Sequence, residues 1–158
     1  MKSLATFVLA LTVVAVVVSP ASAAPPSVIT VVSKTTSESS IDVPPRKDSA
    51  GDRQLFTSRL LNARRQFGKP KGAAVGSDRG TLTLTSARSA NLKTVAKLPG
   101  GTITANGPLL AAGDGAVSVA VVAGTGIFAG AHGTLTILKP TGPKTAVNIY
   151  RLSYRPIA

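Results

Sequence analysis

The stretch "GTGIFAGAHG", residues 124–133, decides how this chain should be interpreted. It contains four glycines, Phe128, and His132, the only histidine of the sequence. Three of the glycines lie one residue off the dinucleotide-binding spacing, which needs a helix after the loop and an acidic residue further on. The next residues, "TLTIL", alternate as a strand does, and no Asp or Glu follows Asp114. A nucleotide site is therefore excluded, and a phosphate-binding loop fails because no Gly-Lys-Ser/Thr follows.

The stretch instead predicts a connection between two strands, with Phe128 turned inward as an apolar plug. Glycines allow the backbone a left-handed turn, a bulge or a close approach to a neighbouring strand. The hairpin glycines are Gly124, Gly126, Gly130 and Gly133. On this pattern alone, His132 is a histidine on a surface turn.

Short alternating segments separated by Gly and Pro run through the rest of the chain. About eight such segments favour an all-β fold, a closed barrel or a sandwich. No amphipathic helix of useful length interrupts them. We expect strands at residues 28–32, 53–61, 80–87, 92–98, 101–107, 115–124, 133–139 and 145–155, and a loop over residues 37–50.

The N-terminus has the pattern of a secretory signal peptide. Lys2 precedes an apolar run over residues 4–18, and small residues lead up to Ala23. The run is shorter than the roughly 20 residues of a membrane-spanning helix. We expect cleavage after Ala23 and secretion. The expected organisation is a signal peptide at 1–23, a tail with a possible first strand at 24–50, and a barrel domain at 51–158 that begins near residue 28.

The chain is strongly basic and lacks cysteine. Its formal net charge is +12, from 18 Lys and Arg against six Asp and Glu. Without cysteine, and with one histidine, neither a disulfide framework nor a structural zinc site is expected, and we expect no cofactor. A basic patch around Phe67 is either the solvated tip of a long hairpin or a non-specific contact for polyanions. It consists of Arg64, Arg65, Lys69 and Lys71.

The order of the blocks at residues 51–62, 68–85, 100–110 and 117–137 resembles the allene oxide cyclase and dirigent-like barrel superfamily. The last block is the most specific, with a strand that runs into Gly-Thr-Gly-x-Phe and returns after a short turn. The resemblance implies an eight-stranded antiparallel β-barrel with an apolar lumen, usually assembled as a trimer. The simple export signal and the absence of cysteine suit a secreted bacterial member of this superfamily better than a plant enzyme.

The resemblance also raises the functional interest of His132, because the matching position is an arginine of the binding pocket in dirigent proteins. We take His132, Asp52 and Glu38 as candidate catalytic groups. For Asp52, capping of a turn at a strand start is the alternative. Phe128, Phe56 and Tyr150 are assigned to the pocket or the barrel packing. The family's catalytic set is not reproduced, so enzymatic activity stays open.

Three functions follow as hypotheses. The first is a barrel that binds a small apolar or aromatic ligand and steers its cyclisation or coupling, since confinement in a dry cavity restricts conformers. The second is a non-catalytic envelope module that uses its basic surface to hold anionic polymers, with no specific recognition of nucleic acid. The third is an isomerase of oxidised lipids, which would lose turnover on His132→Ala or Glu38→Ala.

Overall fold

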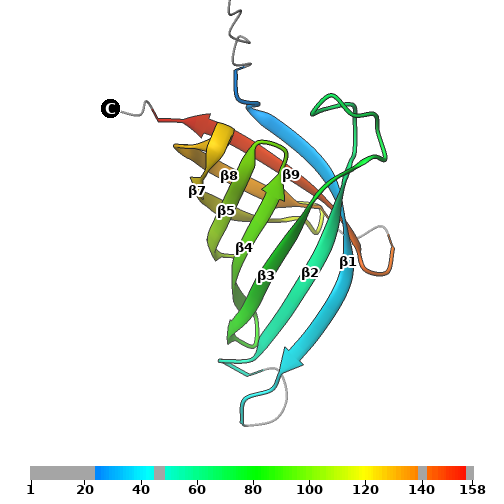
Figure 1. The fold of residues 1–158 in the computed structure, drawn as a ribbon. Helices are drawn as coiled ribbons and strands as arrows, with labels where there is room; N and C mark the ends of the chain where they lie inside the picture. The colour runs from blue at the N-terminus through cyan, green and yellow to red at the C-terminus, as the bar shows by residue number, and fades with distance from the viewer. Residues whose placement is uncertain (1–23, 45–48, 139–141, 156–158) are drawn as a thin grey trace, which may run out of the picture.

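The protein is described from a computed structural model that covers residues 24–44, 49–138 and 142–155. Strands account for nearly all of it (Figure 1). The elements are β1 (Val28–Ile41), β2 (Arg53–Asn62), β3 (Ala74–Ser86), β4 (Ser89–Leu98), β5 (Gly101–Pro108), β6 (Leu110–Ala111), β7 (Val117–Gly124), the 3-10 turn η1 (Gly126–Phe128), β8 (Ala131–Ile137) and β9 (Thr145–Tyr154).

The strands form one antiparallel sheet that closes on itself. Its order is β5-β4-β3-β2-β1-β9-β8-β7-β6, and pairing of β5 with β7 completes the ring. The short β6 only extends the edge of β7 and takes no part in closure. The predicted eight-stranded antiparallel β-barrel is therefore confirmed.

The first strand is longer than the sequence indicated. β1 runs 14 residues to Ile41, whereas the prediction ended at residue 32 and placed residues 37–50 in a loop. Residues 37–41 pair with residues 53–57 of β2, after a register shift between Thr35 and Ser37. Their side chains are exposed, so backbone pairing rather than an apolar face holds this part of the strand. Figure 1 shows β1, β2 and β3 extending past β7 to β9.

Alternation along the strands separates an inner from an outer face. In β4, Leu92, Thr94, Ala96 and Leu98 are buried, and the residues between them are half-buried or exposed. The same two-residue period holds in β2 and β9, as expected for strands with one face turned to a core. Each wall strand thus contributes every second side chain to the barrel interior.

The connection between β7 and β8 confirms the predicted hairpin corner. Gly126 has a φ of +62°, and a Cβ at this position would strike the backbone carbonyl oxygen of Gly100. This close approach lets the Ile127 amide donate to that oxygen at 2.9 Å. Phe128, fully buried, packs into the core as predicted. The corner therefore fastens η1 to the start of β5.

The predicted signal peptide, residues 1–23, lies outside the described residues. Within the ranges that are described, no helix is long and apolar enough to cross a membrane.

Candidate ligand-binding lumen

The barrel interior has two unlike halves. One half, beneath η1 and the first residues of β1, is filled by large side chains with no exposed surface, among them Tyr150, Phe128, Ile29 and Leu60. The other half contains a cavity of about 210 Å³ that opens to solvent. Its lining combines polar and apolar side chains: Ser33, Thr35, Glu38, Gln54, Phe56, Ser58, Asp78, Leu92, Thr94, Leu135, Ile137, Ala146 and Asn148.

Asp78 is the most unusual group of this cavity. It comes from β3, is only 4 % exposed, and lies directly opposite Ser58 of β2. The Ser58 side chain interacts with its carboxyl group, while Oδ1 has no hydrogen-bond partner in the protein. Buried polar atoms are nearly always paired, so an orphaned carboxyl oxygen against a cavity marks a position for a ligand or an ordered water.

Burial also changes the protonation of this carboxyl group. Desolvation raises the pKa of Asp78 to about 6, against opposing hydrogen bonds from Ser58 and from its own backbone. Removal of a carboxylate from water favours the neutral acid, whereas hydrogen bonds to the carboxylate favour the charge. Asp78 is thus able both to accept and to donate a proton within reach of neutral pH.

Tyr150 and Asn148 of β9 supply two further polar atoms without protein partners, the Tyr150 hydroxyl and Asn148 Oδ1. Burial raises the pKa of Tyr150 well above its usual range, and the negative charge of Asp78 raises it further. The Asn148 side chain acts in the opposite direction. Tyr150 is therefore a neutral phenol, packed beneath the cavity rather than available as a base.

Phe56 of β2 forms part of the apolar wall. A Cβ at Gly80 would overlap the Phe56 ring and the carbonyl oxygen of Lys93, so only glycine leaves room for the ring there. Leu92, Leu135 and Ile137 are the other large apolar groups around the space. A guest in this cavity meets these apolar groups on part of its surface, and hydroxyl, amide and carboxyl groups, including that of Asp78, on the rest.

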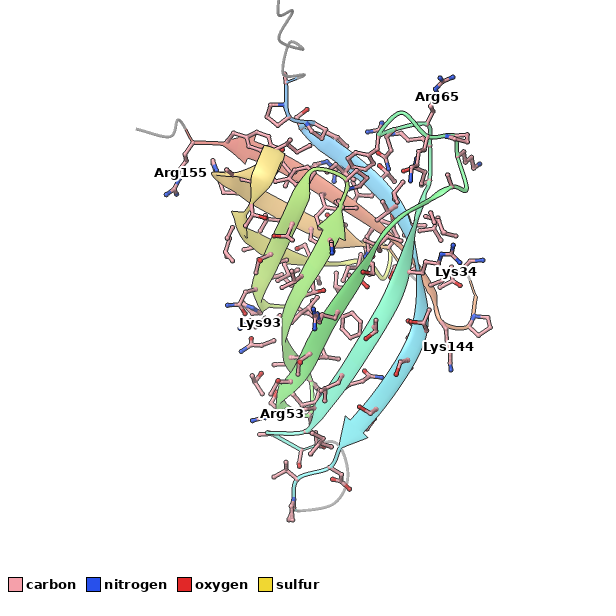
Figure 2. All side chains as sticks on the ribbon, in the orientation of Figure 1. Lys34, Arg53, Arg65, Lys93, Lys144 and Arg155 are labelled. Carbon is pink, nitrogen blue, oxygen red and sulfur yellow. The ribbon has the colours of Figure 1, made fainter. Side chains whose placement is uncertain are left out.

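Glu38 and Gln54 lie where the cavity meets a second hollow. The Gln54 amide donates a hydrogen bond to Glu38 Oε1. Gln54 also borders an outer hollow of about 460 Å³ near the tip of β1 to β3, with Asp52, Arg53, Leu82 and Leu84 in its lining. Figure 2 shows Arg53 at this tip. The Glu38–Gln54 pair therefore stands between the outer hollow and the inner cavity.

Asp52 is already satisfied by its own turn. Its carboxylate accepts hydrogen bonds from the Val43 amide at 2.8 Å and the Ser49 amide at 2.9 Å. These bonds, that from Ser49 first, lower the pKa of Asp52. The alternative of a turn-capping residue is what the structure displays, and the carboxylate holds the connection between β1 and β2.

His132 does not enter the cavity. His132 lies on β8 and pairs with Ser153 of β9; its buried neighbour Ala131 points to the interior, so alternation turns His132 outward. Its Nδ1 lies 3.3 Å from the carbonyl oxygen of Gly130, and it borders a surface hollow beside Arg155. The three candidate catalytic residues are thus not brought together: Glu38 is at the inner mouth, Asp52 in a turn, and His132 outside the barrel.

The predicted basic patch forms the tip of the hairpin between β2 and β3. Asn62 anchors this loop, because its Nδ2 donates to the carbonyl oxygens of Gln66, Lys69 and Pro70 at 2.9 to 3.2 Å. Arg64 donates to the carbonyl oxygen of Val28 and Lys69 to that of Ala74. Two of the four basic side chains therefore connect the loop to β1 and β3, and Arg65 projects from its top (Figure 2).

Sequence reasoning missed Asp78, Ser58 and Asn148, although a signal was present. Asp78 shares the phase of the apolar residues Leu82 and Leu84 along β3. The predicted strand began at Gly80, so this acidic residue on an apolar face stayed outside the pattern. A polar residue at a strand position where the alternation predicts an inward side chain is the sequence signal for such a site.

Metal binding has no obvious place in this arrangement. In the three described ranges, no group of three or more His, Asp or Glu side chains is positioned to hold an ion.

No protein-family model and no curated protein matches the sequence. Solved structures do match in shape. A pyocyanin demethylase superposes with a TM-score of 0.66 at 22% identity, over 80% of this chain and 99% of the other. A pterocarpan synthase dirigent protein gives 0.60 at 14% identity, over 79% and 81% of the two chains.

The Diels Alderase AbmU from Streptomyces koyangensis also gives a TM-score of 0.60, at 16% identity, over 82% of this chain and 65% of the other. Identities this low establish the fold alone. The chain has the fold of the allene oxide cyclase and dirigent-like barrels, as the order of its sequence blocks predicted.

Proposed function

We propose that this barrel binds a small apolar or aromatic molecule that carries a hydrogen-bond donor, and that it steers cyclisation or coupling of that molecule. The observation that carries the proposal is the buried Asp78 carboxyl group with a free oxygen against the cavity. Barrels of this shape that act on small organic molecules, a dirigent protein and a Diels Alderase, support it.

The size of the cavity limits the part of the ligand that enters. A cavity of about 150 Å³ admits benzene, so 210 Å³ fits a one- or two-ring group. A longer substrate would extend past Glu38 and Gln54 into the outer hollow. Such a ligand is held at one end in a fixed orientation, which favours one of its conformers for reaction.

Asp78 is the group for proton transfer in this proposal. With a pKa near 6, it is a carboxylate in most molecules at pH 7 and accepts a proton from the ligand, and its acid form returns one. Ser58 orients the carboxyl group, and Glu38 lies at the mouth as a second carboxylate.

Binding of 2-naphthol and naphthalene tests this function, because the two probes differ by a single hydroxyl donor. At pH 8, we expect the protein to bind 2-naphthol at least about tenfold more tightly, since a hydrogen bond to a charged group contributes about 1.5–3 kcal/mol. Asp78→Ala should abolish the preference and keep naphthalene binding. Equal affinity of the unaltered protein for both probes would refute the role of Asp78.

We also propose that the protein is exported, on the strength of the N-terminal pattern in residues 1–23. N-terminal sequencing of the protein from culture medium should give "APPSV", beginning at Ala24. Recovery only in cell lysate, with Met1 retained, would contradict export.

A further inference from the structure

The outer face of β1 to β4 carries a row of five exposed cations, unrelated to the lumen. They are Lys34, Arg59, Arg79, Lys93 and Lys97, which we name the cationic stripe. Lys34 and Lys93 point away from the barrel in Figure 2.

The strand register makes the stripe continuous. Lys34 lies directly opposite Arg59, and Arg79, which faces Thr57, is the diagonal neighbour of Arg59. On β4, Arg79 faces Val95, with Lys93 and Lys97 two residues to either side. Cross-strand neighbours lie about 5 Å apart and diagonal ones about 7–8 Å, so the charges follow one another across four strands.

No acidic residue compensates these charges on their own face. The outward positions of β1 to β4, all within the described residues, include no Asp or Glu. Glu38 and Asp78 face the lumen, and Asp52 is held in its turn. Like charges opposite one another oppose folding. A negatively charged partner would offset this repulsion, which is consistent with a role of the stripe in binding such a partner.

A hollow on this face contributes hydroxyl groups. It measures about 480 Å³, and its polar border consists of Arg79 and Lys93 together with Ser37, Ser39, Thr57 and Thr81; Leu55, Phe56, Gly80 and Val95 complete the lining. Guanidinium, ammonium and hydroxyl donors are the groups that hold phosphate oxygens, the guanidinium through two parallel bonds. Phe56 is the single aromatic residue in this lining, and the outward positions of β1 to β4 add none, so the face has no row of aromatic rings on which successive nucleic-acid bases would stack.

We propose that the cationic stripe is a docking track for an extended phosphate polymer, recognised through its backbone charges alone. The track lies on the outside of the wall whose inner face forms the cavity. A polymer on the stripe and a small molecule in the lumen can therefore be held together. This inference goes beyond the proposed lumen function and does not depend on it.

Binding of linear inorganic polyphosphate to the purified protein, measured from 50 to 300 mM salt, tests the track. Five contacts predict a slope of log affinity against log salt of about −3.5, and Arg59→Ser/Arg79→Ser should reduce it to about −2.1 and weaken binding about tenfold. The matched control is Arg65→Ser/Lys71→Ser, which removes the same charge from the hairpin tip. It should keep the slope, and unchanged circular dichroism and unchanged urea denaturation report that both variants fold.

Equal losses in the two variants would show attraction by net charge only and would overturn the track. Binding of a single-stranded oligonucleotide or of heparin at least about tenfold tighter than polyphosphate would also overturn it, because the bases or sulfate groups would then be read. A failure of the 2-naphthol experiment leaves the track untouched.

Discussion

The two ends of the barrel interior are built from the same strands but serve opposite purposes. Around Phe128, Leu60 and Tyr150 the inward side chains are large and leave no space. Around Asp78, Ser58 and Thr94 they are short and polar, and a cavity remains. Along β2, β3, β4 and β9, every second residue faces the interior. Large apolar residues at these positions stabilise one end of the barrel, and short polar residues leave a binding space at the other.

The sharpest way to break this comparison is to remove one phenylalanine from each end. Phe128→Ala should lower the free energy of unfolding by about 3–5 kcal/mol, because it empties a fully packed site. Phe56→Ala should cost less, about 1–2 kcal/mol, because Phe56 already borders open space. Urea denaturation measures both. Equal losses would show that the cavity end is as tightly packed as the closed end.

The charge at the open end should reduce stability in a pH-dependent manner. Because burial raises the pKa of Asp78 from 3.8 to about 6, ionisation of this carboxyl group lowers the free energy of unfolding. This loss is absent below pH 4, grows between pH 4 and 6, and is complete above pH 6. It amounts to about 3 kcal/mol.

Asp78→Asn removes this titration. The unfolding free energy of the variant minus that of the unaltered protein should rise by about 3 kcal/mol from pH 4 to pH 8, in denaturation at each pH. Because the prediction concerns how this difference changes with pH, any effect of the amide on stability that does not depend on pH cancels. A difference that does not change with pH would mean that Asp78 is not buried as a charge.

A smaller effect isolates the hydrogen bond that orients the carboxyl group. Ser58→Ala should raise the pKa of Asp78 above 6, since the Ser58 bond favours the carboxylate. The change in stability should be about 1 kcal/mol. NMR titration of the Asp78 side-chain carbon reads the shift directly, and a lowered pKa would contradict the assigned contact.

The smallest effect concerns access. Gln54→Ala removes the partner of Glu38 at the mouth, and both side chains reach solvent. Unfolding free energy should change by less than about 0.5 kcal/mol, while the association rate of 2-naphthol in stopped-flow fluorescence should increase. An unchanged rate would show that ligands enter the cavity elsewhere.

The barrel could be predicted because its signals are local. Alternation along 92–98 and 145–155 and the glycine-rich stretch around Phe128 each specify a strand or a corner without knowledge of the partner. The polar end of β1 gave no such signal. Ser37, Ser39 and Ser40 have exposed side chains and are held by backbone pairing with β2, so no apolar alternation of their own marks them as a strand.

The candidate site was less predictable because its residues are placed by strand register and by the filling of the interior, which are not local signals. The side on which His132 falls depends on the register of β8, where a shift by one residue exchanges interior for surface. Asp78 lies in the lumen because the chain continues β3 upstream of Gly80 and then leaves the space beside it unfilled. Whether the interior is filled depends on the side chains of all the strands together, so a cavity could not be predicted from the sequence of any single strand.

The pairing of β1 with β9 joins the two ends of the described chain, Val28 opposite Arg151. The ring cannot shut until its last strand has been made, and contacts that span nearly the whole chain slow folding. A growing polypeptide of this design therefore cannot complete its barrel before β9 has been synthesised. Such a delay would suit the export proposed above, because a translocation channel for unfolded chains needs the barrel to be still open.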